Sequence, residues 1–129
     1  MDLKEFLFTK DHEWIKEEGN VATVGITDYA QHELGDVVFV ELPHLGETIA
    51  KGDPCSNIES VKAVSDVYAP VSGEIVGINE TLENKPELIN SAPYGDGWIF
   101  KVKIDDTSEL DELMNNEEYD EYLKGILEE

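Results

Sequence analysis

Residues 21–43 read VATVGITDYAQHELGDVVFVELP, and this stretch contains both kinds of secondary structure that the chain is expected to use. In VATVGIT apolar and other side chains alternate, which is typical of a half-buried strand. The residues on its inner face would be Ala22, Val24 and Ile26. DYAQHELG then predicts a short helix, capped by Asp28 with Gln31 three residues later and ended by Gly35.

Strand patterns continue beyond that helix. In DVVFVEL the inner face would hold Val38, Val40 and Leu42 before Pro43 ends the strand. Residues 98–104, WIFKVKI, show the clearest alternation. The side chains expected on one face there are Trp98, Phe100, Val102 and Ile104. Many short strands separated by glycine and proline turn signals predict a mainly β chain with a sandwich or barrel-like core.

The last part of the chain has a different pattern. From Thr107 onward the apolar residues follow a helical spacing, and Asn115 with Glu118 predicts the cap of a second helix. No linker or low-complexity segment divides the sequence. We therefore expect one domain over residues 1–129, with a β core at about 8–104 and a C-terminal helical segment at about 107–127.

The charge balance is strongly acidic. Nine lysines, no arginine and 30 acidic residues among 129 give a formal net charge of −21. Such a field repels phosphate backbones and anionic lipid, so nucleic-acid and membrane partners are not expected. It favours partners with basic faces and a soluble monomer. The chain has no apolar run of membrane-spanning length and no secretory signal pattern, and its single cysteine, Cys55, fits a reducing compartment.

The sequence contains no catalytic apparatus that we can identify. The three histidines, His12, His32 and His44, lack a second ligand at metal-binding spacing, and nothing near Cys55 supplies a base. There is no nucleophile-elbow motif, no phosphate-binding loop and no dinucleotide-binding glycine pattern. We interpret the histidines as surface or hydrogen-bonded residues and Cys55 as a small buried thiol.

Lys62 lies in ESVKAVSD, residues 59–66, and is the only lysine between Lys51 and Lys85. The pattern allows two interpretations. Lys62 could be a strand lysine that pairs with Glu59 or Asp66 across a sheet. It could instead sit at a hairpin tip and be presented to a modifying enzyme, because an amine on a flexible stem suits amide attachment. In that case Glu59 would help an electropositive ligase to recognise the site.

Four stretches carry a resemblance to a known family: HEW (His12–Trp14), Val21–Pro43, Ile58–Ile75 and Leu88–Lys103. With their order and spacing, the chain resembles the H protein of the glycine cleavage system from Phe8 to Tyr122. Biotin carriers, by contrast, usually have methionines beside the modified lysine, where this chain has Val61 and Ala63. The resemblance implies a barrel-sandwich hybrid, like a lipoyl domain, of two antiparallel sheets with a short internal helix and C-terminal helices.

The resemblance also implies a function. Lys62 would carry lipoic acid in amide linkage, attached by a lipoate ligase or a lipoyl/octanoyl transferase. This lipoyl-lysine arm would receive the aminomethyl group of glycine at the pyridoxal-phosphate-dependent glycine decarboxylase (P protein). It would deliver the group to the tetrahydrofolate-dependent aminomethyltransferase (T protein). Dihydrolipoyl dehydrogenase (L protein) would then reoxidise the reduced lipoyl group. The chain would thus be a carrier and not an enzyme, in a bacterial cytoplasm or, if a processed eukaryotic protein, in the mitochondrial matrix.

A labile aminomethyl group needs a cleft that excludes water and offers its amine a carboxylate. By position in the family pattern, Glu13 is the first candidate for that contact and Asp66 the second. Trp14 is expected in the core. Asp11 departs from the hydroxyl residue common in the family. Two other functions stay open: an H-like carrier for lipoyl relay or another redox pathway, and an unmodified acidic interaction module.

Overall fold

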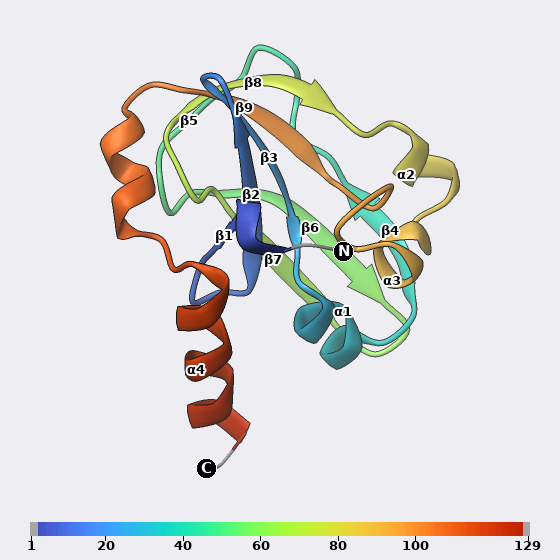
Figure 1. The fold of residues 1–129 in the computed structure, drawn as a ribbon. Coiled ribbons are helices and arrows are strands. Elements are labelled where there is room, and N and C mark those ends of the chain that lie inside the picture. The colour runs from blue at the N-terminus through green and yellow to red at the C-terminus, as the bar shows by residue number, and fades with distance from the viewer. Residues whose placement is uncertain (1–2, 128–129) are drawn as a thin grey trace.

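Two antiparallel β-sheets dominate the computed structural model, which describes residues 3–127 (Figure 1). The larger sheet has the strand order β1-β2-β3-β9-β8-β5 and the smaller one β4-β6-β7. The strands are β1 Phe6–Phe8, β2 Glu13–Glu18, β3 Val21–Ile26, β4 Val37–Glu41, β5 Thr48–Ile49, β6 Pro54–Ser60, β7 Val64–Tyr68, β8 Gly73–Ile78 and β9 Phe100–Ile104. The α-helices are α1 Asp28–Leu34, α2 Thr81–Asn84, α3 Leu88–Ser91 and α4 Asn116–Leu127, and 3-10 helices span Leu3–Glu5 and Thr107–Glu112. The predicted fold class is confirmed.

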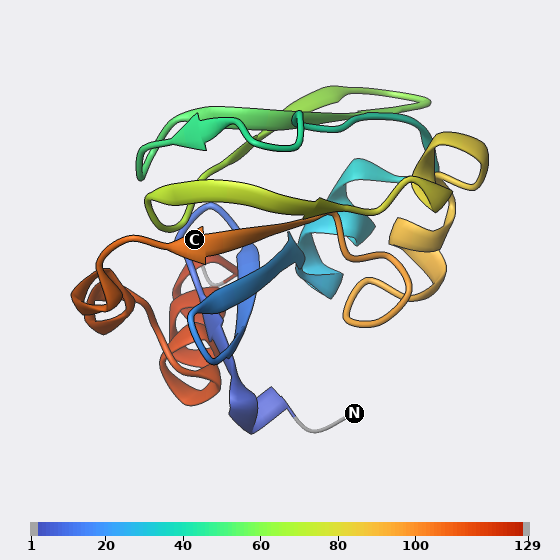
Figure 2. The same ribbon diagram turned by 90° about the horizontal axis from the view of Figure 1, so that it is seen from above.

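The hydrophobic core lies between the two sheets, which Figure 2 shows as facing layers. Alternation supplies its side chains, because every second residue of a strand points to the same face. The inner residues predicted for β3 are all buried, and so are Phe100, Val102 and Ile104 of β9. Trp98 precedes β9 and packs instead against a second cluster, which contains Trp14, on the outer side of the larger sheet. Trp14 is buried, as expected, and its indole N–H donates to the Pro93 carbonyl oxygen at 2.8 Å.

The inner face predicted for β4 is wrong at Val38. Val37 and Val40 are buried, whereas Val38 and Phe39 are 49% and 52% exposed. The pairing of β4 with β6 shifts register between Val37 and Phe39, which is a β-bulge. An extra residue at a bulge breaks the two-residue alternation, so two neighbouring apolar side chains point outward.

The helix α1 forms where the sequence predicts it, but its cap is Thr27 and not Asp28. The Thr27 hydroxyl accepts a hydrogen bond from the Ala30 N–H at 3.2 Å, while Gln31 donates to the Asp28 side chain. Gly35 ends the helix with φ of 80°, a conformation that favours glycine. Two one-turn helices, α2 and α3, lie between β8 and β9 where no helix is expected from the sequence.

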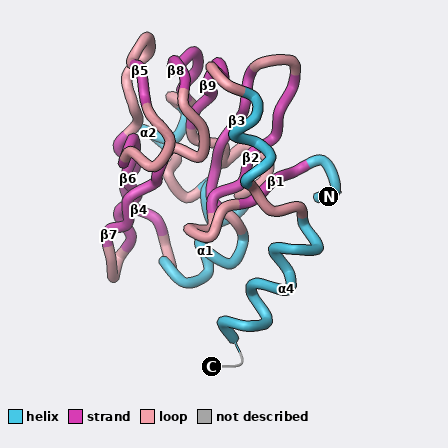
Figure 3. The backbone as a smooth tube through the Cα atoms, turned by 90° about the vertical axis from the view of Figure 1, so that its left-hand side faces the viewer, coloured by secondary structure: helices cyan, strands magenta, loops and turns pink. Residues whose placement is uncertain are grey.

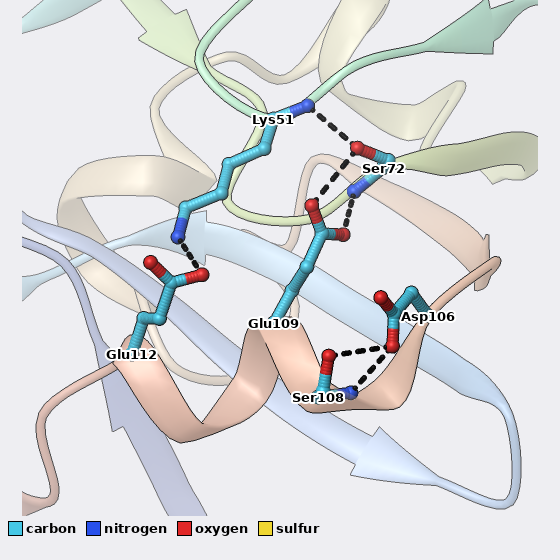
Figure 4. Close-up of polar contacts among 6 residues, drawn as sticks. All are labelled: Lys51, Ser72, Asp106, Ser108, Glu109 and Glu112. Carbon is cyan, nitrogen blue, oxygen red and sulfur yellow. Dashed lines mark hydrogen bonds and ion pairs between the residues drawn. The ribbon is translucent and has the colours of Figure 1, made fainter.

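Polar contacts hold the 3-10 helix Thr107–Glu112 against the loops before β6 and β8 (Figure 4). The Glu109 carboxylate accepts hydrogen bonds from the Ser72 N–H at 2.8 Å and from the Ser72 hydroxyl at 3.1 Å. Lys51 forms an ion pair with Glu112 at 2.8 Å and donates its backbone N–H to the Ser72 hydroxyl. These contacts fix where the chain leaves the β core.

The helix α4 follows, capped as predicted by reciprocal hydrogen bonds between Asn115 and Glu118. It extends away from the sheets in Figure 3. Its anchor is Tyr119, which is buried and stacks on Phe8 of β1 with ring centroids 4.7 Å apart. Because Phe8 also exchanges backbone hydrogen bonds with Met114, the start of α4 is fixed to the edge of the larger sheet.

Gly25 offers a test of the packing around Trp14, which it faces across the β2–β3 pair. A Cβ atom at Gly25 would lie 2.7 Å from the Trp14 indole, so Gly25→Ala should lower the free energy of unfolding by about 1–3 kcal/mol. Gly125→Ala in α4 is the control, because nothing lies within 4 Å of its Cβ position. That control should raise stability by about 0.5–1 kcal/mol in the same urea titrations. Equal effects of the two substitutions would contradict the packing.

Candidate functional site

Lys62 lies at the tip of the hairpin that joins β6 to β7. The Ser60 hydroxyl accepts hydrogen bonds from the backbone N–H groups of Lys62 (3.3 Å) and Ala63 (3.0 Å). The Val61 N–H donates to the Asp36 carbonyl oxygen at 3.0 Å, which attaches the tip to the segment after α1. The turn is therefore closed by a buried serine, and the Lys62 side chain is left exposed.

The interpretation of Lys62 as an ion-paired strand residue is wrong. Lys62 lies between the strands, and within residues 3–127 no ion pair joins it to Glu59 or Asp66. Its stem instead runs past the end of α1, where a Cβ atom at Gly35 would lie 3.4 Å from Lys62 Cε. That distance is an ordinary van der Waals contact, so glycine is favoured at position 35 by its φ of 80° and not by the lysine stem.

A cleft of about 330 Å³ begins beside this tip. Its walls are α1, β7 and the segment 11–13, and it extends from Ala63, the neighbour of Lys62, to Glu13. Asp66 lines the same cleft, so the structure brings together the two carboxylates that were proposed as contacts for a bound amine. Glu59 does not line it; it lies on the exposed face of the small sheet, paired with Phe39 and Val64.

The carboxyl group of Glu13 is buried, with only 2% of the residue exposed. Its Oε1 accepts a hydrogen bond from the Thr9 hydroxyl at 2.7 Å, and its Oε2 accepts one from the Tyr68 N–H at 3.1 Å. Burial raises the pKa of Glu13 from 4.5 to about 7, although the hydrogen bonds from Thr9 and Tyr68 act in the opposite direction. At neutral pH this group is therefore poised between its two protonation states.

The remaining charge in the cleft is negative. Asp11 and Glu33 join Glu13 and Asp66 in its lining, and no lysine is among the lining residues that the structure describes. Four carboxylates around a partly desolvated space favour a cation, because Coulomb attraction strengthens as the local dielectric falls. The cleft is chemically suited to a protonated amine.

His12 lines the cleft and also joins it to the C-terminal helix. Its Nδ1 lies 2.8 Å from the Tyr119 hydroxyl, which in turn lies 2.8 Å from the hydroxyl of Thr27. The residue adopts φ of 68°, unusual for a side chain larger than glycine, and burial lowers its pKa. This chain of contacts joins α4, α1 and the segment that carries Glu13. The sequence analysis missed it.

Other candidate chemistry is not supported within the described residues. No group of three or more His, Cys, Asp or Glu side chains there could hold a metal ion. Cys55 is half-buried, and burial raises its pKa to about 12, which keeps the thiol protonated. A larger groove of about 740 Å³ between α1 and α4 shares Tyr29 with the cleft but contains none of the predicted site residues. None of the described helices is long and apolar enough to span a membrane.

Comparison with known proteins identifies the family. The family model for the glycine cleavage H-protein matches residues 6–126. The chain belongs to the glycine cleavage H-protein family. It is 54% identical over 121 residues to the glycine cleavage system H protein of Pectobacterium atrosepticum, covering 93% of each chain. It is 53% identical over 119 residues to that of Staphylococcus epidermidis, covering 92% of this chain and 94% of the relative.

A solved H-protein structure agrees with the fold. The crystal structure of a glycine cleavage system H protein from Mycobacterium marinum matches with a TM-score of 0.82 and 41% identity. The match covers 90% of this chain and 94% of the other. The resemblance drawn from the sequence motifs is thereby confirmed, as is the arrangement of two antiparallel sheets that it implied.

The raised pKa of Glu13 predicts how stability depends on pH. Ionising a carboxyl group whose pKa is raised by folding destabilises the folded state, so this loss develops as pH rises from about 4.5 to about 7. Glu13→Gln removes the titration. As pH rises from 4.5 to 8, the unfolding free energy of the variant minus that of the wild type should therefore increase by about 3 kcal/mol. Urea unfolding at several pH values measures the difference, and a constant difference would contradict it. The exposed Glu74→Gln is the control.

Proposed function

We propose that this chain is the lipoyl carrier of a glycine cleavage system, acting as one domain over residues 1–129 with lipoic acid in amide linkage to Lys62. The observation that carries the proposal is the position of Lys62: an exposed lysine on a closed turn, at the mouth of an acidic cleft, in a member of the H-protein family. The site fits the group, because the amine is free of ion pairs among the described residues and the cleft begins at the neighbouring residue, Ala63.

A lipoyl group at this position would supply a disulfide that accepts the aminomethyl cargo of glycine. The partners follow from that chemistry: glycine decarboxylase for loading, aminomethyltransferase for unloading onto tetrahydrofolate, and dihydrolipoyl dehydrogenase for reoxidation. A lipoate ligase or a lipoyl/octanoyl transferase would modify Lys62. In this proposal the chain is a shared substrate of those enzymes and has no catalytic role of its own. Its proposed place is the bacterial cytoplasm, since the relatives named above come from bacteria.

The cleft residues of this chain would protect the cargo. We assign Glu13 and Asp66 to the protonated amine, with Glu13 as the main contact because it is buried and Asp66 at the exposed edge of β7. A cation next to Glu13 would stabilise its ionised form and offset the effect of burial. The hydrogen bonds from Thr9 and Tyr68 hold the carboxylate in place while leaving it further lone pairs for the amine.

The first test is the modification itself. Lys62→Arg should fold with an unchanged melting temperature, because the side chain is exposed, and should gain no acyl mass because a guanidinium cannot accept the acyl group. Intact mass and peptide mapping after expression in lipoate-replete cells measure both proteins. Acyl mass on the variant, or an unmodified wild-type Lys62, would refute the proposed attachment. Lipoylated wild-type protein that glycine decarboxylase fails to load would indicate a carrier for lipoyl relay or another redox pathway.

The second test concerns cargo protection. Glu13→Gln should still be lipoylated and loaded, but it should lose the aminomethyl group to water about tenfold faster, since a hydrogen bond between charged groups contributes about 1.5–3 kcal/mol. Loss is followed by mass spectrometry after the decarboxylase has been removed. Glu74→Gln, an exposed carboxylate on β8, should retain the cargo as the wild type does. Equal rates for all three proteins would remove Glu13 from the cleft contact.

A further inference from the structure

Four apolar side chains form an exposed patch around Lys62, which we call the tip patch: Val38, Phe39, Val61 and Val64. They are 49%, 52%, 68% and 64% exposed. Phe39 pairs with Glu59 across β4 and β6, and Glu59 pairs with Val64 across β6 and β7, so these three side chains form one row on the outer face of the small sheet. Val61 belongs to the turn beside Lys62, and Val64, on the edge strand β7, also lines the acidic cleft.

The backbone is shaped to expose this patch. Regular alternation along β4 would bury either Val38 or Phe39, but the bulge between Val37 and Phe39 turns both outward. At the hairpin tip the buried Ser60 hydroxyl accepts the hydrogen bonds that close the turn. The side chains of Val61 and Val64 are therefore left exposed to solvent. Exposed apolar residues that cluster around a single acid on a strongly charged protein mark a surface that another molecule covers.

The reach of the lysine identifies that molecule. An enzyme that forms the amide must bring an acyl carbonyl to Nζ, which a fully extended stem holds only roughly 6 Å from its Cα atom. Its surface must then contact the neighbours of Lys62, the residues of the tip patch. Enzymes that act at the far end of the attached arm work at roughly twice that distance. These enzymes can therefore react with the end of the attached group without contacting the tip patch.

We infer that the tip patch is the docking surface for the enzyme that acylates Lys62, and that this surface is needed for modification but not for later turnover. The inference rests on the proposed function. The partner would present an apolar hollow for Phe39 and Val64, with a basic group opposite Glu59, which lies between them. The net charge of −21 favours the same kind of partner.

The step at this interface is an acyl transfer from an activated donor, either an acyl adenylate or an acyl thioester. The Nζ–carbonyl bond forms while the bond from the carbonyl carbon to the adenylate or thiol breaks, and the leaving group keeps the electron pair. The ammonium group loses two protons in total, one to become a nucleophile and one as the amide forms. Nothing in the tip patch takes part chemically. Its contribution is to position Nζ at the donor.

The experiment compares Phe39→Ser and Val61→Ser, neither of which lines the acidic cleft, with Val76→Ser, a valine on β8 of the other sheet that is 43% exposed. Each unmodified protein is incubated with a lipoate ligase, lipoate and ATP, and intact mass gives the initial rate of Lys62 acylation at sub-saturating protein. We expect kcat/KM to fall about tenfold or more for the two patch variants, with wild-type rates for Val76→Ser. Phe39→Leu should restore most of the rate. Unchanged melting temperatures establish that the variants are folded.

The second arm uses the same variants after excess ligase has acylated them fully. Loading from glycine by the decarboxylase should then stay within about twofold of the wild-type rate. Wild-type acylation rates for Phe39→Ser and Val61→Ser would overturn this inference alone. Slow loading of fully acylated variants would overturn it too, by assigning the patch to the decarboxylase. Absence of acylation on wild-type Lys62 would instead overturn the proposed carrier function, and this inference with it.

Discussion

The buried carboxylate of Glu13 is the contact on which the cleft depends. Glu13 begins β2 in the larger sheet and accepts a hydrogen bond from Tyr68, the last residue of β7 in the smaller one. One side chain thus joins the two sheets at the inner end of the cleft. Burial raises its pKa to about 7, so the ionised form costs stability at neutral pH. A buried acid that costs stability in this way is consistent with a site that binds a cation.

The rest of the cleft is assembled around that contact from elements distant in sequence. α1 forms one wall although none of its residues is fully buried, and the Thr27 cap ties its start to Tyr119 of α4. Tyr119 also contacts His12, the neighbour of Glu13. The C-terminal helix, which extends away from the sheets, therefore contributes to the site through one buried side chain.

The hairpin tip places Lys62 between two surfaces of different character. The Ser60 hydroxyl closes the turn, so Lys62 projects outward with apolar residues on the outer face of the small sheet beside it. The acidic cleft begins at Ala63 and runs along β7, where Val64 belongs both to its lining and to the exposed apolar surface. A lysine between an exposed apolar surface and an acidic cleft can meet an enzyme on one side and withdraw an attached group to the other.

The sequence by itself determined the mainly β fold, the family, the short internal helix, the capped C-terminal helix and the position of Lys62. These follow from local periodicity, turn residues and contiguous motifs. The sequence also pointed to Glu13 and Asp66, through the family pattern. Only the tertiary structure decided that Glu13 is buried and that a bulge exposes Val38 and Phe39. Those features depend on partners far along the chain, such as Tyr68 for Glu13 and β6 for β4, and local patterns do not encode which strand meets which.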